Sequence, residues 1–351
     1  MTNALVLYAD RGALGEYRVR FPAQAVSDRS AEFGMRAEST NTLGVDADRI
    51  AEGLNVKRVY VPGGIDVISF QRPSSPSSFH VIEWLRRNRP QLGIVVELDA
   101  EMTMPYTDIW LRRAMDLAHV VTLSTPAQSG LYPHDNKRVI RDSVPSTYLT
   151  YPARTLSRKK SSADIDADRI IGGASLDSRD IGVMGGVLSE VVGADRTGGR
   201  RVTFRYIGED WPDVYHPLGV ARGDFEASGA LPPNLYHVAL GEIDIAVVPQ
   251  ETPRSGIRAL EFAAAGVPVI GSITPEHEWL RDAGMPLWLV KPRGRDWLKA
   301  LRSVLSLDDA ELKDLARQHR ENVRMNHTTE QRAIEWADAW RSAAKLAKKG
   351  I

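Results

Sequence analysis

Short apolar runs alternate with longer segments of helical spacing over most of the chain. In the first half, mainly apolar runs of four to seven residues stand at 4–8, 56–61, 67–70, 93–98 and 118–124. Runs of this length, bounded by polar or glycine-containing loops, predict buried strands. Between them, segments such as 17–26 and 78–87 have the apolar spacing of amphipathic helices. This alternation predicts an α/β protein with a doubly wound sheet, whose first part ends with a strand at 139–144.

A second alternating series follows a segment of different composition. Residues 151–168 are rich in serine and charge and show no sustained periodicity, which is typical of a linker. Strands are then expected at 169–173, 202–208 and 245–248, with a helix from about 180 to 192. The sequence therefore predicts two Rossmann-like domains, 1–150 and 169–328. The remaining residues, 329–351, predict a long amphipathic helix whose apolar set is Ile334, Trp336, Trp340 and Ala344.

Composition narrows the class of protein. A chain of 351 residues that is 43% hydrophobic is long enough for two cores. Its 45 basic and 45 acidic residues balance, so no overall charge favours nucleic acid or an anionic membrane as the main partner. The absence of cysteine excludes disulfides, thiolate catalysis and cysteine–zinc sites. No leader-like start or long apolar stretch is present, and the sequence therefore predicts a cytoplasmic protein without a membrane span.

The most informative segment is 243–271, IDIAVVPQETPRSGIRALEFAAAGVPVIG. A strand at 245–248 ends at Pro249, and a helix begins after Gly256 and ends at Gly266. The start of such a helix offers unpaired N–H groups and the positive end of its dipole, which suits a phosphate. Arg254 and Arg258 add full charges. The segment therefore predicts an anion site around Ser255, Gly256 and Ile257.

This segment resembles the donor-site signature of retaining glycosyltransferases with the GT-B fold, and specifically the glycosyltransferase family 4 pattern. The match is carried by a basic-x-x-Glu-x-x-Ala-x-Gly-x-Pro-Val-Ile pattern. The matching residues are Ser255, Arg258, Glu261, Gly266, Pro268, Val269 and Ile270.

The resemblance implies more than the residues alone. It implies two Rossmann-like domains facing one another across a cleft, with 329–351 packing back on the first domain. It implies a nucleotide-sugar donor as co-substrate, no other cofactor and no bound metal, because protein charges replace the metal. By the same resemblance Glu261 binds the ribose hydroxyls, and a basic residue at the position of Arg179 contacts the diphosphate.

Each donor-site residue also has a plainer interpretation. Gly173 lies in a glycine-containing loop where backbone can approach a ligand, but this loop is also consistent with a simple strand-to-helix turn beside a solvated Arg179. Arg258 is spaced for a surface salt bridge with Glu261 as well as for a phosphate. Glu261 is either a solvated acid or a buried one that needs a donor, and its apolar neighbours favour burial.

The sugar-side chemistry departs from the family. The family often has a glutamate eight positions before the ribose ligand, where this chain has Pro253. Glu251 or Gln250 stands near enough in sequence to replace it, and we expect Glu251 to be a catalytic residue.

On the first domain, Asp99 and Glu101 follow the strand at 93–98, and together with Glu97 they alternate on one face of an extended segment. Such acids either position an acceptor hydroxyl or cap a loop, and no histidine or further oxygen set completes a metal site. We assign Asp99 and Glu101 to catalysis.

The loops at the predicted carboxyl edge of the first sheet supply the acceptor candidates. These are Gly15, Tyr17, Arg18 and Arg72. The loop that contains Gly15 faces the cleft in the family.

The sequence thus predicts transfer of a sugar from a nucleotide-diphosphate sugar to a hydroxyl of a glycan, a protein or a small molecule. The resemblance implies that the transfer is of hexosyl or related type and that it retains the anomeric configuration. A neutral charge balance leaves nucleic acid open as an acceptor. Two other classes fit the same pattern: a sugar-nucleotide epimerase of the same fold, and a non-catalytic nucleotide-sugar-binding relative.

Overall fold

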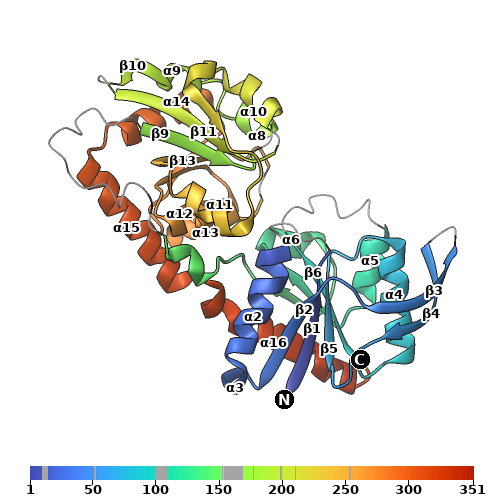
Figure 1. The fold of residues 1–351 in the computed structure, drawn as a ribbon. Helices are drawn as coiled ribbons and strands as arrows, with labels where there is room; N and C mark the ends of the chain where they lie inside the picture. Colours follow the sequence, from blue (N-terminus) through green and yellow to red (C-terminus); the bar gives the residue numbers. More distant parts are fainter. Residues whose placement is uncertain are drawn as a thin grey trace. The chain divides into compact units, whose positions relative to one another are not determined.

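The computed structural model describes residues 1–9, 15–50, 53–99, 109–151, 153, 169–176, 178–197, 200–209, 211–252 and 254–351. The chain forms two compact units (Figure 1). The first unit contains Met1–Pro145 together with Thr329–Ile351, and the second contains Ser146–Thr328. The division falls five residues before the predicted end of the first domain at 150. Most of the predicted linker at 151–168 lies outside the described residues, and a cleft between the units stays a prediction from the resemblance.

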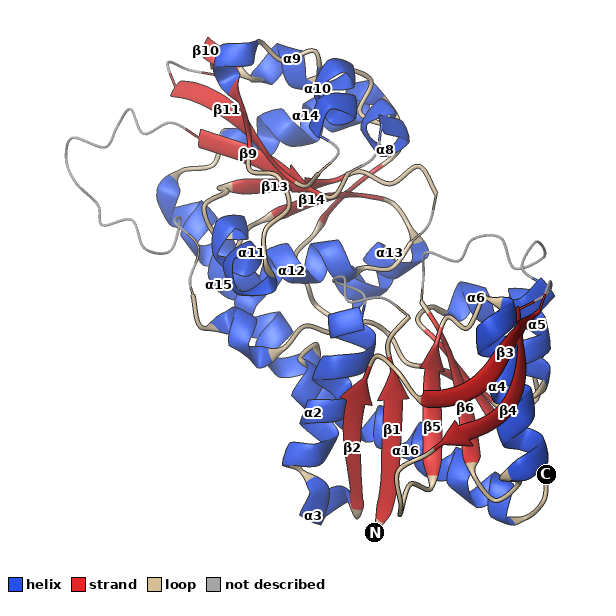
Figure 2. Ribbon diagram, turned by 45° about the vertical axis from the view of Figure 1, so that its right-hand side comes forward, coloured by secondary structure: helices blue, strands red, loops and turns tan. Residues whose placement is uncertain are grey.

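The first unit is built on a six-stranded parallel sheet with the order β2-β1-β5-β6-β7-β8. Strands β2, β1, β5 and β6 run side by side in the same direction (Figure 2). The chain order reverses at β1, which pairs with β2 on one side and β5 on the other, as in a doubly wound sheet. The strands are β1 (Thr2–Leu7), β2 (Met35–Thr40), β5 (Val67–Gln71), β6 (Gly93–Leu98), β7 (Val120–Leu123) and β8 (Lys137–Val139).

Both faces of this sheet are buried. In β1, Ala4 and Val6 belong to one apolar core, while Leu5 and Leu7 belong to the other. Helices α2 and α16 contribute to the first core, and α4 and α5 to the second. The helices of this unit are η1 (Glu16–Arg20, a π-helix), α2 (Phe21–Asp28), α3 (Ser30–Phe33), α4 (Pro76–Asn88), α5 (Ile109–Asp116), α6 (Pro126–Leu131) and α16 (Thr329–Lys348).

The last helix, α16, packs against β6 within the first unit. Trp336 and Trp340 are almost fully buried in the core that it shares with β1 and α2. At Gly93 a Cβ atom would lie 2.8 Å from the α16 backbone, so only glycine permits this close approach. The side chain of Ile334 is 39% exposed, unlike those of Trp336 and Trp340. Its assignment to the apolar set of this helix was therefore wrong.

A β-hairpin stands outside the main sheet of the first unit. It consists of β3 (Gly44–Ile50) and β4 (Gly53–Tyr60), which pair antiparallel, and β4 packs against α4. The predicted strand after 139 is also wrong, because β8 ends at Val139. The difference at β8 arises at the edge of the six-stranded sheet, where a strand needs only one buried face or very few residues.

The second unit has a seven-stranded sheet whose main path is β10-β11-β9-β13-β14-β15, with β12 alongside β11. All pairs are parallel except β10 with β11. The chain order reverses at β9, which lies between β11 and β13. The strands are β9 (Arg169–Ala174), β10 (Gly193–Thr197), β11 (Arg200–Ile207), β12 (Phe225–Ala227), β13 (Ile245–Val248), β14 (Val269–Ser272) and β15 (Trp288–Val290). The sequence located the cores of β9, β11 and β13.

One predicted helix of the second unit differs from the structure. The single helix expected at 180–192 is two short helices, because Gly185 and Gly186 take positive φ angles of 63° and 74°. The helices are η2 (Ser146–Leu149, 3₁₀), α8 (Ser178–Gly182), α9 (Leu188–Val191), α10 (Trp211–Leu218), η4 (Arg222–Asp224, 3₁₀), α11 (Pro233–Leu240), α12 (Ile257–Ala265), α13 (Pro275–Asp282), α14 (Gly294–Leu305) and α15 (Asp309–Asn326). In the described part of the chain, no helix is both long and apolar enough to cross a membrane.

Candidate functional site

The candidate donor site lies where the second sheet ends in loops, beside the strand at which the order reverses. Strand β13 is fully buried, and the loop after it leads to α12. The helix begins without a side-chain cap at Gly256, and the N–H of Ile257 lies 3.4 Å from Ser255 Oγ. The first turn of α12 therefore presents backbone N–H groups at the carboxyl edge of a parallel sheet, the usual place for a phosphate.

Gln250 holds this loop in shape. Its Nε2 donates to the Ser255 carbonyl oxygen at 3.3 Å, and its Oε1 accepts from the Arg254 N–H at 3.4 Å. Its own N–H donates to Ser272 Oγ at 2.8 Å, which ties the loop to β14. The side chain of Gln250 is thus engaged in bracing the loop that precedes α12.

Asp180 connects the loops that follow β9 and β13. This buried carboxylate accepts from the Glu251 N–H at 3.0 Å and lies 3.3 Å from Arg254 Nη1. Glu251 and Arg179 flank this contact, and both are exposed. Sequence reasoning missed Asp180, although its position directly after Arg179 in a strand-to-helix turn was a usable signal.

Glu261 is fully buried and is held by two protein donors. Arg258 Nη1 donates to Glu261 Oε2 at 2.8 Å, and the Tyr236 hydroxyl donates to the same oxygen at 3.0 Å. Arg258 Nη1 also donates to the Tyr236 hydroxyl at 3.0 Å, which closes a triangle. The sequence was consistent with two roles for Arg258, a salt bridge with Glu261 or phosphate binding. The structure contains the salt bridge. The burial of Glu261 alone therefore does not require a ribose.

Tyr236 remains a neutral hydrogen-bond donor in this triangle. Burial raises the pKa of its hydroxyl well above the ordinary value, and the nearby Glu261 carboxylate acts in the same direction. Tyr236 comes from α11, more than twenty residues before Glu261, and sequence reasoning gave no signal for it.

The glycine at the end of β9 has a packing role. A Cβ atom at Gly173 would lie 2.5 Å from Leu176 Cδ1, so the glycine makes room for the buried Leu176 side chain. Two residues after Gly173, Ser175 has a left-handed φ of 49°. The small residues of this loop are thus required by the turn itself.

In the first unit, two acceptor candidates prove to be core residues. Arg18 is 1% exposed, and its Nε donates to Glu97 Oε1 at 2.6 Å. Its Nη1 donates to the Ile140 carbonyl oxygen at 2.6 Å and lies 3.2 Å from Asp142 Oδ1. Tyr17 is also buried. The structure thus does not bring the side chains of Arg18 and Tyr17 to a surface where an acceptor would contact them.

Glu97 lies at the centre of this cluster. Burial raises the pKa of Glu97 to about 8, although Arg18 acts in the opposite direction. The guanidinium of Arg18 also lies 4.6 Å from the ring centroid of Trp336, which adds a cation–π contact. These contacts connect η1, β6 and α16 inside the first unit.

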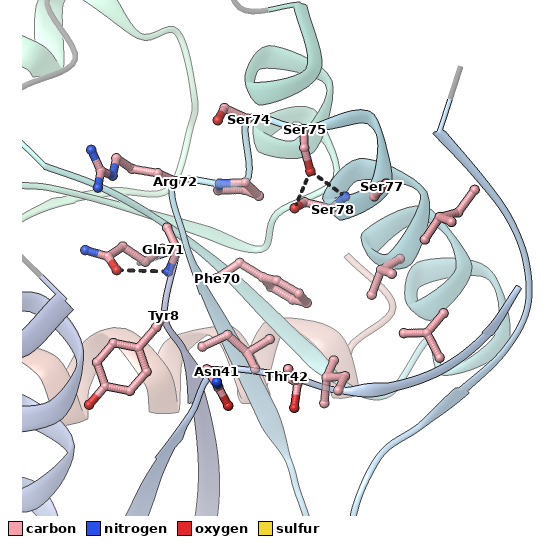
Figure 3. A pocket seen from close by; sticks show the side chains of 17 residues that line it. Tyr8, Asn41, Thr42, Phe70, Gln71, Arg72, Ser74, Ser75, Ser77 and Ser78 are labelled. Atoms are coloured by element: carbon pink, nitrogen blue, oxygen red, sulfur yellow. Dashed lines mark hydrogen bonds between the residues drawn. The ribbon is translucent and has the colours of Figure 1, made fainter. Parts of the chain in front are cut away.

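Arg72 and Asp99 form an ion pair at the carboxyl edge of the first sheet. Arg72 Nε lies 3.0 Å from Asp99 Oδ2, and the Asp99 carboxylate is buried. Arg72 has a φ of 40°, which is strained for a residue with a side chain. It also lines a cavity of about 360 Å³ (Figure 3). Gly15 directly precedes η1, and Glu101 and Pro253 lie outside the described residues.

A metal centre is not evident in the described part of the chain. There, histidine and acidic side chains form no group of three that is suited to hold a metal ion. Independence from metals stays a prediction from the resemblance.

Comparison with known proteins identifies the fold. Residues 189–338 match the family model described as glycosyl transferase-like. No curated protein sequence matches the chain.

Solved structures match over nearly the whole chain. Sucrose-phosphate synthase from Thermosynechococcus elongatus has a TM-score of 0.67 at 14% identity, covering 97% of this chain and 98% of that one. HepE from Anabaena, in complex with UDP, has a TM-score of 0.64 at 12% identity, covering 97% and 100%. The catalytic domain of starch synthase IV from Arabidopsis thaliana, bound to ADP and acarbose, has a TM-score of 0.67 at 10% identity, covering 98% and 99%. At these identities the likeness establishes the fold. The chain therefore has the GT-B fold with two Rossmann-like domains and contains a glycosyltransferase-like domain.

Proposed function

We propose that this protein is a retaining glycosyltransferase that moves a sugar, of hexosyl or related type, from a nucleoside-diphosphate sugar to a hydroxyl acceptor. The observation that carries the proposal is the uncapped start of α12 at the carboxyl edge of the second sheet, followed one turn later by the buried Glu261 carboxylate. The match of residues 189–338 to a glycosyl transferase-like family supports it. Two proteins of similar fold were solved with UDP or ADP, which supports a nucleoside diphosphate as the ligand.

The donor would engage charges and amides that already lie at this edge. Its diphosphate would accept hydrogen bonds from the amides of 255–257 and approach the exposed Arg179. Its ribose hydroxyls would join the hydrogen-bond network of Glu261, with Arg258 next to the diphosphate. Neutralising the leaving diphosphate and fixing its position would together lower the barrier to transfer.

Asp99, Glu101 and Glu251 are the carboxylates that we assign to catalysis. Asp99, held by Arg72, would orient the acceptor hydroxyl, and Glu101 would assist it. Glu251 would lie on the sugar side of the donor, where its exposed carboxylate follows the N–H group that Asp180 holds.

Calorimetric titration with UDP, ADP and GDP tests the donor site. Replacing Arg258 with Ala, or Glu261 with Gln, should weaken binding of the preferred nucleotide about 10- to 100-fold, because each removes a hydrogen bond that involves a charged group. Arg201→Ala is the matched control, since Arg201 pairs with Asp224 on an exposed part of the same unit. Unchanged affinity in both site variants would rule out this site.

Product analysis separates transfer from the rival activities. Incubation with the preferred nucleotide sugar and a panel of hydroxyl acceptors should yield a glycoside that keeps the anomeric configuration of the donor. Conversion of the donor to an isomeric nucleotide sugar without any acceptor would identify an epimerase instead.

A further inference from the structure

Asp180 is a buried carboxylate at the edge of the second sheet, and the proposed function gives its charge no role. It lies in α8, which follows β9, and its side chain is 4% exposed. A carboxylate at this depth is costly unless charged or polar groups compensate it. Groups that compensate Asp180 come from a different loop, the one that joins β13 to α12. Asp180 therefore connects two loops.

Strands β9 and β13 are parallel neighbours, so the loops that follow them lie at the same edge of the sheet. Across this edge, Asp180 Oδ1 accepts from the Glu251 N–H at 3.0 Å. Its other oxygen, Oδ2, lies 3.3 Å from Arg254 Nη1. The carboxylate thus fixes the backbone of the loop at one point and an arginine side chain at another.

Arg254 is held both at its backbone and at its guanidinium. Its N–H donates to Gln250 Oε1 at 3.4 Å, and its Nη1 lies against Asp180. The side chain is nevertheless 29% exposed, so a ligand can reach it. An arginine that is oriented before a ligand arrives loses less entropy on binding than a free one. Because Arg254 stands two residues before Gly256, a pre-oriented cation precedes the uncapped start of α12 in the chain.

The negative charge of Asp180 has two opposite effects on an anion near Arg254. It offsets part of the positive charge, which weakens the attraction, and it orients the guanidinium, which favours a defined hydrogen bond. Its contact with the Glu251 N–H favours the second effect, because a carboxylate that only neutralised Arg254 would not need to hold the backbone of the loop. Removing the charge distinguishes the two effects by the sign of the change in affinity.

We propose that Asp180 is a positioning residue, which does not contact the donor but orients Arg254 toward a phosphate at the start of α12. This inference rests on the proposed function, because the diphosphate of the donor is the anion that Arg254 would meet. It makes the binding of the diphosphate depend on a carboxylate from the neighbouring loop, and it makes that dependence act through Arg254.

A double-mutant cycle on the full chain tests this inference, with calorimetric titration of UDP, ADP and inorganic pyrophosphate. In Asp180→Asn the amide oxygen still accepts from the Glu251 N–H, whereas the charge that holds Arg254 is lost. We expect this variant, and Arg254→Ala, each to bind pyrophosphate and the preferred nucleotide about tenfold more weakly. In the Arg254→Ala background, Asp180→Asn should cause no further loss, because the side chain that it positions is absent.

Asp224→Asn is the matched control. Asp224 pairs with Arg201 at 3.0 Å in the same unit, at the amino ends of β11 and β12, and its replacement should leave both affinities unchanged. Urea unfolding shows whether each variant is folded under the conditions of the titration. If Asp180→Asn does not fold, Arg254→Ala on its partly exposed residue still tests the inference, since unchanged affinity in that variant would overturn it.

Three results would overturn the inference: tighter binding of pyrophosphate by Asp180→Asn, unchanged binding by it, or an equal loss in the parent and Arg254→Ala backgrounds. The first is the result of a carboxylate that only neutralises Arg254, and the last is that of a purely structural carboxylate. If the parent protein binds neither nucleotide nor pyrophosphate, the proposed function falls with the inference. If binding depends on Asp180 as expected but no nucleotide sugar yields a glycoside, the proposed function falls alone.

Discussion

The two units share a topology but place their charges differently. In each, the strand order reverses at one strand, β1 in the first unit and β9 in the second. The first unit buries its ionic cluster of Arg18, Glu97 and Asp142 in the core, and Arg72 is the charged residue among those described at the cavity of its carboxyl edge. The second unit brings charged side chains, including Arg258, to its carboxyl edge.

This difference separates what topology determines from what side chains determine. A doubly wound sheet creates a crevice at the switch point whatever the sequence, and so it fixes where a ligand binds. The charges at the crevice fix which ligand binds there. The uncapped helix start at the edge of the second unit is the feature on which the proposed phosphate site rests.

The largest effect should come from the buried cluster of the first unit. Arg18→Met would leave Glu97 and Asp142 buried without their cation, which should lower the free energy of unfolding by about 3–5 kcal/mol. Urea unfolding measures this loss, with Arg201→Met on the exposed surface of the second unit as the control. Affinity for nucleoside diphosphates at low denaturant should not change. A loss below about 1 kcal/mol would show that the cluster does not stabilise the core, and would reopen a binding role for Arg18.

Acid should destabilise both units through buried histidines, among them His119 and His319. Burial lowers the pKa of His119 to about 4 in the first unit and that of His319 to about 4 in the second. Because the folded pKa lies below the ordinary value of 6.5, the stability that each neutral histidine contributes is complete above pH 6.5. It is lost as the pH falls through 4. For the fully buried His319 this amounts to about 3 kcal/mol, at about 1.4 kcal/mol per pKa unit.

Asparagine replacements test this acid response. In His319→Asn the side-chain amide can donate to the Leu315 carbonyl oxygen as Nδ1 does, and in His119→Asn the amide oxygen can accept from the Ile94 N–H. Each variant should lose less stability than the parent between pH 6.5 and pH 4, measured by urea unfolding at a series of pH values. An identical pH dependence in the parent and both variants would show that other groups cause the acid response.

A smaller effect is expected from Tyr236, which contacts Glu261 in the second unit. If its hydroxyl positions Glu261 for a ribose, then Tyr236→Phe should reduce the preference for UDP over 2′-deoxy-UDP, or for ADP over 2′-deoxy-ADP, about tenfold. Tyr206→Phe is the matched control, because it removes a buried hydroxyl that contacts the Leu176 carbonyl oxygen at 3.3 Å. A purely structural tyrosine would weaken both nucleotides equally. That result would exclude a positioning role.

The sequence predicted the elements with strong local patterns. The bounds of β6 and β13 and the start of α12 follow from apolar runs closed by proline, glycine or polar residues, and the structure confirms them. The two Rossmann-like domains are likewise confirmed by the fold. The strand predicted at 56–61 overlaps β4 of the hairpin, whereas β3 was missed because its sequence is largely polar.

The contacts within the sites could not be predicted in the same way. Arg18 resembles a surface residue in sequence, since its burial depends on Glu97 and Asp142, which lie more than 75 residues away. Tyr236 and Asp180 reach the donor loop from separate helices, and no spacing rule relates such distant positions. Glu261 was predicted to be buried and is so, but its partners are protein side chains that the sequence did not identify.

The smallest expected effect concerns two strained residues, one at each carboxyl edge. Ser175 in the second unit and Arg72 in the first have φ angles of 49° and 40°, which glycine adopts without a Cβ penalty. Ser175→Gly should therefore stabilise the protein by up to about 1 kcal/mol in urea unfolding, because the relieved strain exceeds the added chain entropy. Arg72→Gly relieves similar strain but removes the cation that pairs with the buried Asp99, so it should not stabilise. Equal stabilisation by both would show that the ion pair between Arg72 and Asp99 contributes nothing to stability.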